Sequence, residues 1–204
     1  MASNSALATA ISITNTAGAA AYVIGTPESV PFTLVGNGYN DNTLYVWDEV
    51  QNFTLTSDLY VDRVADANEN YVGGSAGNYF LKAGTIVSSH YVQWDPSGTQ
   101  NVEATLNFDS DIFAFITKDS KLSDSDFLGL AGINYGDFAL RGLESGDITN
   151  FNGGSVDIHW TASNPGDWTR LITAESPSAT VPEPTMLSLL FLGLTGIVYR
   201  RRRV

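Results

Sequence analysis

The sequence has 204 residues, which is enough for one domain of ordinary size followed by a tail. Its hydrophobic fraction of 43% and its aromatic fraction of 11% allow a buried core, and they exclude disorder along the whole length. The formal net charge is -12, and all 22 acidic side chains but only six of the ten basic ones precede residue 185. Such an acidic body excludes binding to a nucleic-acid backbone.

The first ten residues lack the basic and apolar stretches of a secretory signal peptide. Residues 5–8, Ser-Ala-Leu-Ala, are nevertheless typical of the small-residue cleavage site at the end of such a peptide. Two interpretations of residues 1–10 stay open. They are the remnant of a signal peptide whose start lies upstream or was trimmed, or they are a disordered Ala/Ser/Thr-rich start.

Residues 11–174 are expected to form one all-β domain. Apolar and polar residues alternate most clearly at Val102–Phe108 and Val156–Thr161, which predicts strands with one buried and one solvated face. Trp160 continues the buried set of Val156 and Ile158 and is expected in the core. Further strands are expected at Phe32–Val35, Leu44–Trp47, Gln51–Thr56, Leu59–Val64, Gly84–Trp94, Asp111–Thr117 and Trp168–Thr173.

Glycine-rich turn signals separate these short segments, for example at residues 36–38, 73–74, 95–98 and 152–154. Eight to ten short strands at this spacing predict an antiparallel β-sandwich, jelly-roll-like or of related connectivity.

One short helix is expected among the strands. Ser123 is a suitable N-cap, Asp126 follows three residues later, and Gly129 is a suitable end. The nearby acids Asp119, Asp124 and Asp126 are candidate calcium ligands, because hard cations bind several loop oxygens. Asp62, Asp66, Asn68 and Glu69 form a second acidic group, and neither group matches an EF-hand. Solvated loop acids and electrostatics in the first turn of the helix explain the same residues.

The sequence contains few of the residue patterns that are typical of enzyme active sites. Cysteine is absent, which excludes disulfides, thiolate metal sites and a cysteine nucleophile. The two histidines, His90 and His159, are too few for an ordinary zinc site, and no acid that would orient a catalytic histidine is evident. No nucleophile elbow, zinc-protease or phosphate-loop motif occurs. The body is therefore expected to be non-enzymatic and to need no cofactor other than possible calcium.

Aromatic side chains offer a second kind of site. Trp168 follows Pro-Gly-Asp in an expected loop, so it is the candidate for an exposed ring that stacks on a glycan. A tryptophan in an alternating strand is more often part of the core, and that alternative stays open for Trp168 too.

The C-terminal region changes character. A Ser/Pro/Thr-containing linker at 175–181 leads to Pro182, Glu183 and Pro184, and an apolar run of 13 residues follows. As a helix, this run would be about 20 Å long, which is short for a hydrocarbon core of about 30 Å. The run is expected to be a short transmembrane helix, and its anchoring side chains are Met186, Leu187, Leu189, Leu190, Phe191, Leu192, Leu194, Ile197 and Val198.

Four arginines, Arg200, Arg201, Arg202 and Arg203, follow the apolar run. Guanidinium groups resist transfer through lipid, so these arginines are expected to stay on the cytoplasmic side and to place the body outside the membrane.

A Pro-Glu-Pro motif, a short apolar helix and a terminal arginine cluster, in this order over 182–204, resemble the PEP-CTERM sorting signal. The resemblance implies recognition by an exosortase, a membrane peptidase that cleaves near the motif, in a bacterium that makes exopolysaccharide or biofilm matrix. It also implies export, transient residence in the inner membrane, and a final place at the cell surface or outside the cell. Pro182, Glu183 and Pro184 would then be substrate residues.

Three functions are compatible with these patterns. The first is a non-enzymatic surface or extracellular-matrix protein. The second is a carbohydrate-binding module for exopolysaccharide. The third is a polysaccharide hydrolase, for which the sequence nominates no pair of carboxylates.

Overall fold

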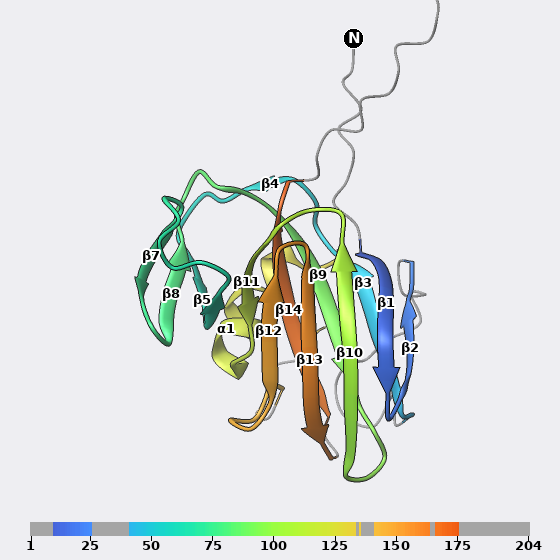
Figure 1. Cartoon of the computed structure of the whole chain (residues 1–204). Coiled ribbons are helices and arrows are strands. Elements are labelled where there is room, and N and C mark those ends of the chain that lie inside the picture. Colours follow the sequence, from blue (N-terminus) through green and yellow to red (C-terminus); the bar gives the residue numbers. More distant parts are fainter. Residues whose placement is uncertain (1–9, 26–40, 134, 136–140, 164–165, 176–204) are drawn as a thin grey trace, which may run out of the picture. The chain divides into compact units, whose positions relative to one another are not determined.

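The computed structural model describes residues 10–25, 41–133, 135, 141–163 and 166–175. These residues all belong to one unit, Ala6–Pro177. They form fourteen strands in three sheets and two short helical segments (Figure 1).

The four-stranded sheet has the order β1-β10-β13-β12 and is antiparallel throughout. Its alternating strands bury one face, and in β10 and β13 this aligns Val102 with Trp160 and Leu106 with Val156. The bounds are Ala10–Ala17 for β1, Gln100–Phe108 for β10, Ile148–Asn152 for β12 and Ser155–Ala162 for β13.

The seven-stranded sheet has the order β2-β3-β9-β14-β11-β6, with β4 also pairing with β9. All its pairs are antiparallel except β2 with β3. The bounds are Ala20–Val23 for β2, Thr43–Asp48 for β3, Phe53–Thr54 for β4, Arg63–Val64 for β6, Ile86–Trp94 for β9, Ile112–Ile116 for β11 and Asp167–Ala174 for β14.

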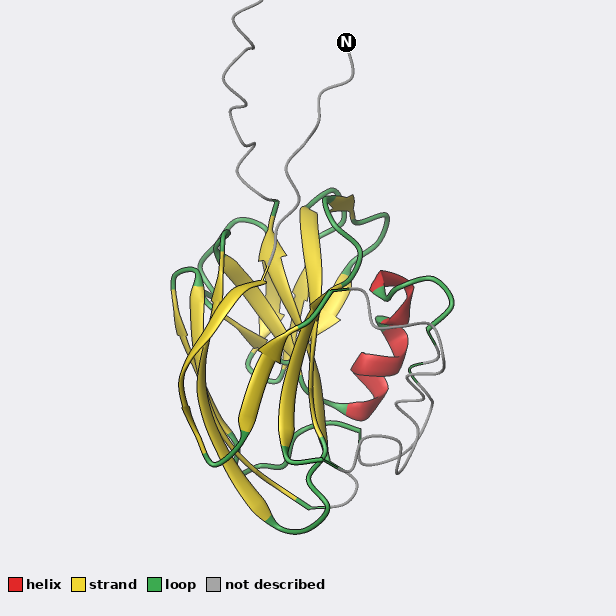
Figure 2. Cartoon of the chain, turned by 90° about the vertical axis from the view of Figure 1, so that its right-hand side faces the viewer, coloured by secondary structure: helices red, strands yellow, loops and turns green. Residues whose placement is uncertain are grey.

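A small third sheet has the order β5-β8-β7. Its strands are β5 (Leu59–Val61), β7 (Val72–Ser75) and β8 (Asn78–Leu81). The helical segments are α1 (Asp119–Asp124) and the 3-10 helix η1 (Asp126–Leu128). Figure 2 shows these two segments together on one side of the sheets.

Two hydrophobic clusters cover the two faces of the seven-stranded sheet. One joins it to the four-stranded sheet and contains Trp94, Trp160 and Leu171. The other contains Trp47, Leu122 and Trp168, and it includes residues of the small sheet and the helical segments. Neighbouring β14 residues such as Leu171 and Ile172 therefore enter different clusters. Because both of its faces are covered, β14 is buried along almost its whole length.

The structure confirms a mostly β body with antiparallel pairing, and the finer assignment as a jelly-roll-like sandwich stays a prediction. The alternation predictions are confirmed by β10 and β13, and Trp160 is buried as expected. The predicted strand Leu59–Val64 is divided between β5 and β6, which belong to different sheets. Strands β1, β2, β7, β8 and β12 were not predicted, and Phe32–Val35 lies outside the described residues.

The short helix lies near the predicted place but begins earlier. Its N-cap is Lys118, which makes no side-chain cap hydrogen bond, so the prediction of Ser123 as N-cap is wrong. Ser123 lies inside the last turn of α1. Ser125 separates α1 from η1, and its hydroxyl donates to the Leu122 carbonyl at 2.9 Å. Gly129 ends η1 as expected.

Within the described part of the chain, no helix has the length and apolar character that crossing a membrane requires. The predicted membrane segment at 186–198 lies outside the described residues.

Candidate functional site

The residues predicted to direct sorting fall outside the described part of the chain. They comprise Pro182, Glu183 and Pro184, the apolar segment and the four arginines. The folded body offers two further places where polar side chains gather, one on a sheet face and one at the ends of three strands.

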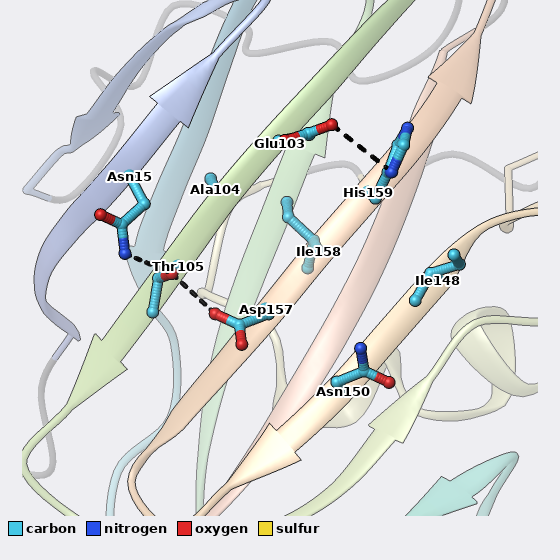
Figure 3. A pocket seen from close by; sticks show the side chains of 9 residues that line it. All are labelled: Asn15, Glu103, Ala104, Thr105, Ile148, Asn150, Asp157, Ile158 and His159. Atoms are coloured by element: carbon cyan, nitrogen blue, oxygen red, sulfur yellow. Dashed lines mark hydrogen bonds and ion pairs between the residues drawn. The ribbon is translucent and has the colours of Figure 1, made fainter.

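An open groove of about 350 Å³ crosses the outer face of the four-stranded sheet (Figure 3). Strand alternation places the polar side chains of the groove on the outer face, while Ala104 and Ile158 point into the core and form part of the groove floor. The nine lining residues come from all four strands and include no Phe, Tyr or Trp: Asn15, Glu103, Ala104, Thr105, Ile148, Asn150, Asp157, Ile158 and His159.

Hydrogen bonds connect the groove side chains across the strands. The Asn15 amide donates to the Thr105 hydroxyl at 3.1 Å, and that hydroxyl donates to the Asp157 carboxylate at 2.6 Å. His159 Nδ1 lies 3.6 Å from a Glu103 carboxylate oxygen, with both side chains at least half exposed. Such a surface can exchange hydrogen bonds with a hydroxylated ligand, but it has no Phe, Tyr or Trp ring on which a sugar could stack.

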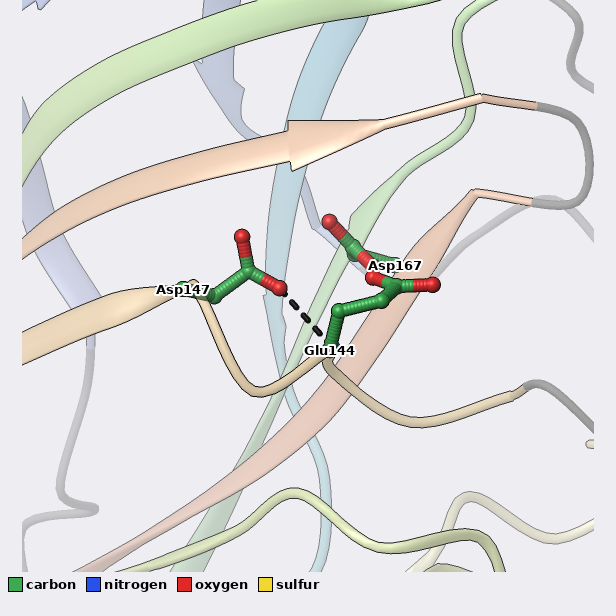
Figure 4. Close-up of side chains that lie close together, drawn as sticks. All are labelled: Glu144, Asp147 and Asp167. Carbon is green, nitrogen blue, oxygen red and sulfur yellow. Dashed lines mark hydrogen bonds between the residues drawn. The ribbon is translucent and has the colours of Figure 1, made fainter.

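The second gathering is a carboxylate trio of Glu144, Asp147 and Asp167 (Figure 4). Glu144 and Asp147 belong to the segment that leads into β12, and Asp167 is the first residue of β14. One oxygen from each lies within 4.8 Å of the others. In Figure 4 the Glu144 and Asp167 carboxyl groups point toward one another, with Asp147 beside them.

The three carboxylates differ in their surroundings. Asp147 accepts backbone N–H groups from Thr161 at 2.9 Å and from Glu144 at 2.8 Å. Asp167 is completely buried, and neither of its oxygens accepts a hydrogen bond from a described residue. Burial, the adjacent Glu144 carboxyl group and the charge of Asp147 raise the pKa of Asp167 to about 9. Chemically, the trio can share protons or bind a cation.

The predicted calcium ligands Asp119, Asp124 and Asp126 do not form such a group among the described residues. Asp126 is paired with Arg141 through two hydrogen bonds of 2.7 and 2.9 Å. Asp119 accepts the Gly142 N–H at 2.5 Å, whereas Asp124 lies on the surface. Asp126 therefore has its charge balanced by a cationic side chain, which weakens the case for a metal ion there.

The expectation of an exposed Trp168 ring is wrong. Trp168 is 1% exposed, because it lies in β14 with its ring in the cluster beside the helical segments. The four tryptophans are all buried. Among the described aromatic residues, Tyr22, Tyr60 and Phe127 are more than half exposed, and none of them lines the groove.

The two histidines lie in different environments. His90 is completely buried, with Nδ1 2.7 Å from an Asp48 oxygen and Nε2 3.1 Å from the Thr173 hydroxyl, while His159 is in the exposed groove. In the second acidic group, Asp62 is engaged within the fold, whereas Asp66, Asn68 and Glu69 are exposed. Asp62 accepts the Thr117 and Lys118 N–H groups and pairs with Lys121 at 3.0 Å.

Sequence reasoning missed the carboxylate trio. The segments Leu-Glu-Ser-Gly-Asp at 143–147 and Pro-Gly-Asp at 165–167 look like ordinary acidic turns. A weak signal was the position of Asp167 just before the predicted strand Trp168–Thr173, whereas the strand that follows Asp147 was not predicted. Only the sheet order brings these strand ends together.

Comparison with known proteins adds one match. Residues 180–203 match the family model described as the PEP-CTERM protein-sorting motif, which confirms the resemblance drawn from the sequence. The searches of curated proteins and of solved structures returned no match to the chain. The motif implies export, membrane-associated sorting and processing by an exosortase. This chain therefore carries a PEP-CTERM sorting signal and is a protein sorted through an exosortase.

Proposed function

We propose that the chain is a non-enzymatic cargo protein whose β body ends at the cell surface or in the extracellular matrix. The observation that supports this most strongly is the sorting motif at 180–203. In this proposal, the exosortase reads Pro182, Glu183 and Pro184. A Pro-X-Pro segment is extended and stiff, so a peptidase can engage it without first unwinding a helix.

The remainder of the tail holds the chain for processing. The apolar run at 186–198 spans the inner membrane transiently as a short helix, and Arg200–Arg203 remain on the cytoplasmic side. This orientation presents the Pro-Glu-Pro segment and the body on the outer side of that membrane.

The described histidines support a non-catalytic role for the body. His90 is buried and both of its ring nitrogens contact other side chains, so it cannot reach a substrate. The exposed His159 is close to Glu103 within an open sheet face, where a substrate would remain in water.

The sorting proposal is tested by the intact mass and the terminal peptides of the protein recovered from host cells and medium. Wild-type protein should end near Pro182–Pro184 without Arg200–Arg203. A Pro182→Ala/Pro184→Ala variant should remain uncleaved in membranes. Pro177→Ala, a proline change outside the matched range, should be processed normally. Wild-type chains that keep Val204 and stay in membranes would refute the proposal.

The groove on the four-stranded sheet favours a second candidate function, binding of the exopolysaccharide. Its amide, hydroxyl and carboxylate groups can hydrogen-bond to sugar hydroxyls. Affinity electrophoresis in the purified polysaccharide tests this. Asn150→Ala should reduce the retardation, while Asn78→Ala on the exposed part of β8 should not. Equal mobility with and without polysaccharide would exclude this function.

A further inference from the structure

The carboxylate trio brings three negative side chains to one place from distant parts of the sequence. Glu144 and Asp147 are about twenty residues from Asp167 along the chain, yet their oxygens lie within 4.8 Å of one another. No ion pair joins these three carboxylates to a cationic side chain of the described residues. Arg63 donates to the Asp147 backbone carbonyl at 3.4 Å rather than to a carboxylate.

Asp167 is the observation that points to a ligand. Its side chain is completely buried, and both oxygens lack a donor among the described residues. Asp147, beside it, is fixed by two backbone N–H groups and keeps lone pairs free on both oxygens. Burying an ionised carboxylate without a partner is strongly unfavourable, so such a group requires either a proton or a cation.

We propose that Glu144, Asp147 and Asp167 bind one divalent cation, and that calcium fits the site best. All three ligands offer oxygen, which hard cations prefer, and no nitrogen or sulfur ligand is in the group. Calcium binds oxygen at 2.3–2.6 Å, so two oxygens on one ion lie at most about 5 Å apart. The trio satisfies this limit. Magnesium would need oxygens within about 4.2 Å of one another and retains more of its water.

The ion has a route to the trio. Glu144 is exposed and lines a pocket of about 400 Å³ that also contacts Thr117–Ser120 and Gly142–Leu143. The exposed side of Glu144 leaves space for water molecules to complete the six to eight ligands of calcium. The site therefore combines two buried anchors, Asp147 and Asp167, with one carboxylate that faces solvent.

The rival arrangement is a shared proton. Two ionised carboxylates cannot donate to one another, whereas a protonated Asp167 could donate to Glu144. In this case Asp167→Asn would keep a donor in the same place. The amide would be tolerated, and calcium would have no effect.

Calcium titration of the full 204-residue chain in non-ionic detergent distinguishes the two arrangements. Protein treated with EGTA is titrated with CaCl2 at pH 7.5 by calorimetry, and its Tm is measured in EGTA, CaCl2 and MgCl2 at matched ionic strength. We expect one site per chain, with a Kd on the order of 10⁻⁴–10⁻³ M as in extracellular calcium modules. Calcium at ten times Kd should raise Tm by about 3–6 °C.

Three variants identify the ligands. Asp167→Asn should abolish the calcium-dependent rise in Tm, and Glu144→Gln should weaken binding at least about tenfold. Asp124→Asn removes an exposed carboxylate outside the trio and should bind as wild type does. Because Glu144 is exposed, Glu144→Gln keeps the test decisive if Asp167→Asn fails to fold. The proposal is overturned by a wild-type protein that shows no calcium response, or by a Glu144→Gln or Asp167→Asn variant with the wild-type Kd.

Discussion

The buried pair of Arg170 and Glu49 gives the sharpest test of what stabilises the body. Both side chains are completely buried, and they form two hydrogen bonds, Nε to Oε2 at 2.7 Å and Nη2 to Oε1 at 3.0 Å. Burial alone would lower the pKa of Arg170, but the Glu49 carboxylate raises it above its ordinary value. We therefore expect the charged pair to act as one energetic unit.

The size of the effect follows from what each substitution leaves behind. Glu49→Met leaves Arg170 with an Asp126 oxygen at 3.1 Å and the Ser125 hydroxyl at 2.6 Å. Arg170→Met leaves the buried Glu49 with the Ser89 hydroxyl at 2.5 Å and no arginine. Removing one member of a buried pair costs about 3–5 kcal/mol, and we expect Arg170→Met to lie at the upper end.

The double variant Glu49→Met/Arg170→Met removes both charges together. Methionine fills much of the vacated volume, so the double variant should lose only about 1–3 kcal/mol. The interaction energy from the cycle should then be about 3 kcal/mol or more, far beyond the roughly 0.5 kcal/mol of independent sites.

Urea unfolding followed by tryptophan fluorescence and circular dichroism measures these free energies in all four proteins. Equal m-values would show that the variants share the same unfolded reference. Losses that add within about 0.5 kcal/mol would refute the claim that this ion pair is a coupled unit.

Three other predictions concern the body. Gly142→Ala should lower the free energy of unfolding by about 1–3 kcal/mol, because the new Cβ would lie 2.0 Å from the Thr117 carbonyl oxygen. Gly146 has open space around it, so Gly146→Ala should be neutral when the two variants are compared by thermal unfolding. Tryptophan emission should be quenched weakly by acrylamide until the protein unfolds; strong native-state quenching would contradict the burial of Trp168 and the other three rings. Burial raises the pKa of Tyr91 to about 12 in the folded protein, compared with about 10 in the unfolded chain. The contribution of the neutral Tyr91 side chain to stability is therefore complete below pH 10 and is lost as the pH rises from 10 to 12. An ultraviolet titration should therefore show one tyrosine class that ionises only near or after alkaline unfolding.

Regular alternation made some of the fold predictable from the sequence. Val102–Phe108 and Val156–Thr161 alternate because each has one face in the core, and the structure pairs them in β10 and β13. Strands β7 and β8 of the small third sheet gave no such signal. In the sequence, Gly73 and Gly74 of β7 indicate a turn. The structure places them in a strand, where Gly74 has a φ of 85°.

The error at Trp168 has a specific physical cause. The Pro-Gly-Asp before it suggested a loop, whereas Trp168 is the second residue of β14. In the structure β14 lies between β9 and β11, and both of its faces are covered. A polar residue on β14 therefore needs a partner inside the fold. Arg170, for example, pairs with Glu49, which lies 121 positions away in the sequence.

The carboxylate trio was unpredictable for a related reason. A sequence shows that Glu144, Asp147 and Asp167 are acidic, but it does not show which strand ends are neighbours. Their proximity depends on the path from β12 through β13 to β14, which changes from one sheet to another. The sorting motif behaves in the opposite way, because its three elements are consecutive and need no fold to be recognised.

This separation between folding and sorting sequences has a consequence for the exported product. The last described contacts near the C-terminus involve Ala174, whose N–H donates to the Asp111 carbonyl, and Glu175, which accepts from Ser110. Cleavage near Pro182–Pro184 removes none of the described contacts, so the proposed cation site would be retained in the released body. Calcium is scarce in the cytoplasm and abundant outside the cell, and a ligand that binds only the folded state stabilises it in proportion to the logarithm of its concentration. On this proposal the body gains stability at the point where it leaves the cell.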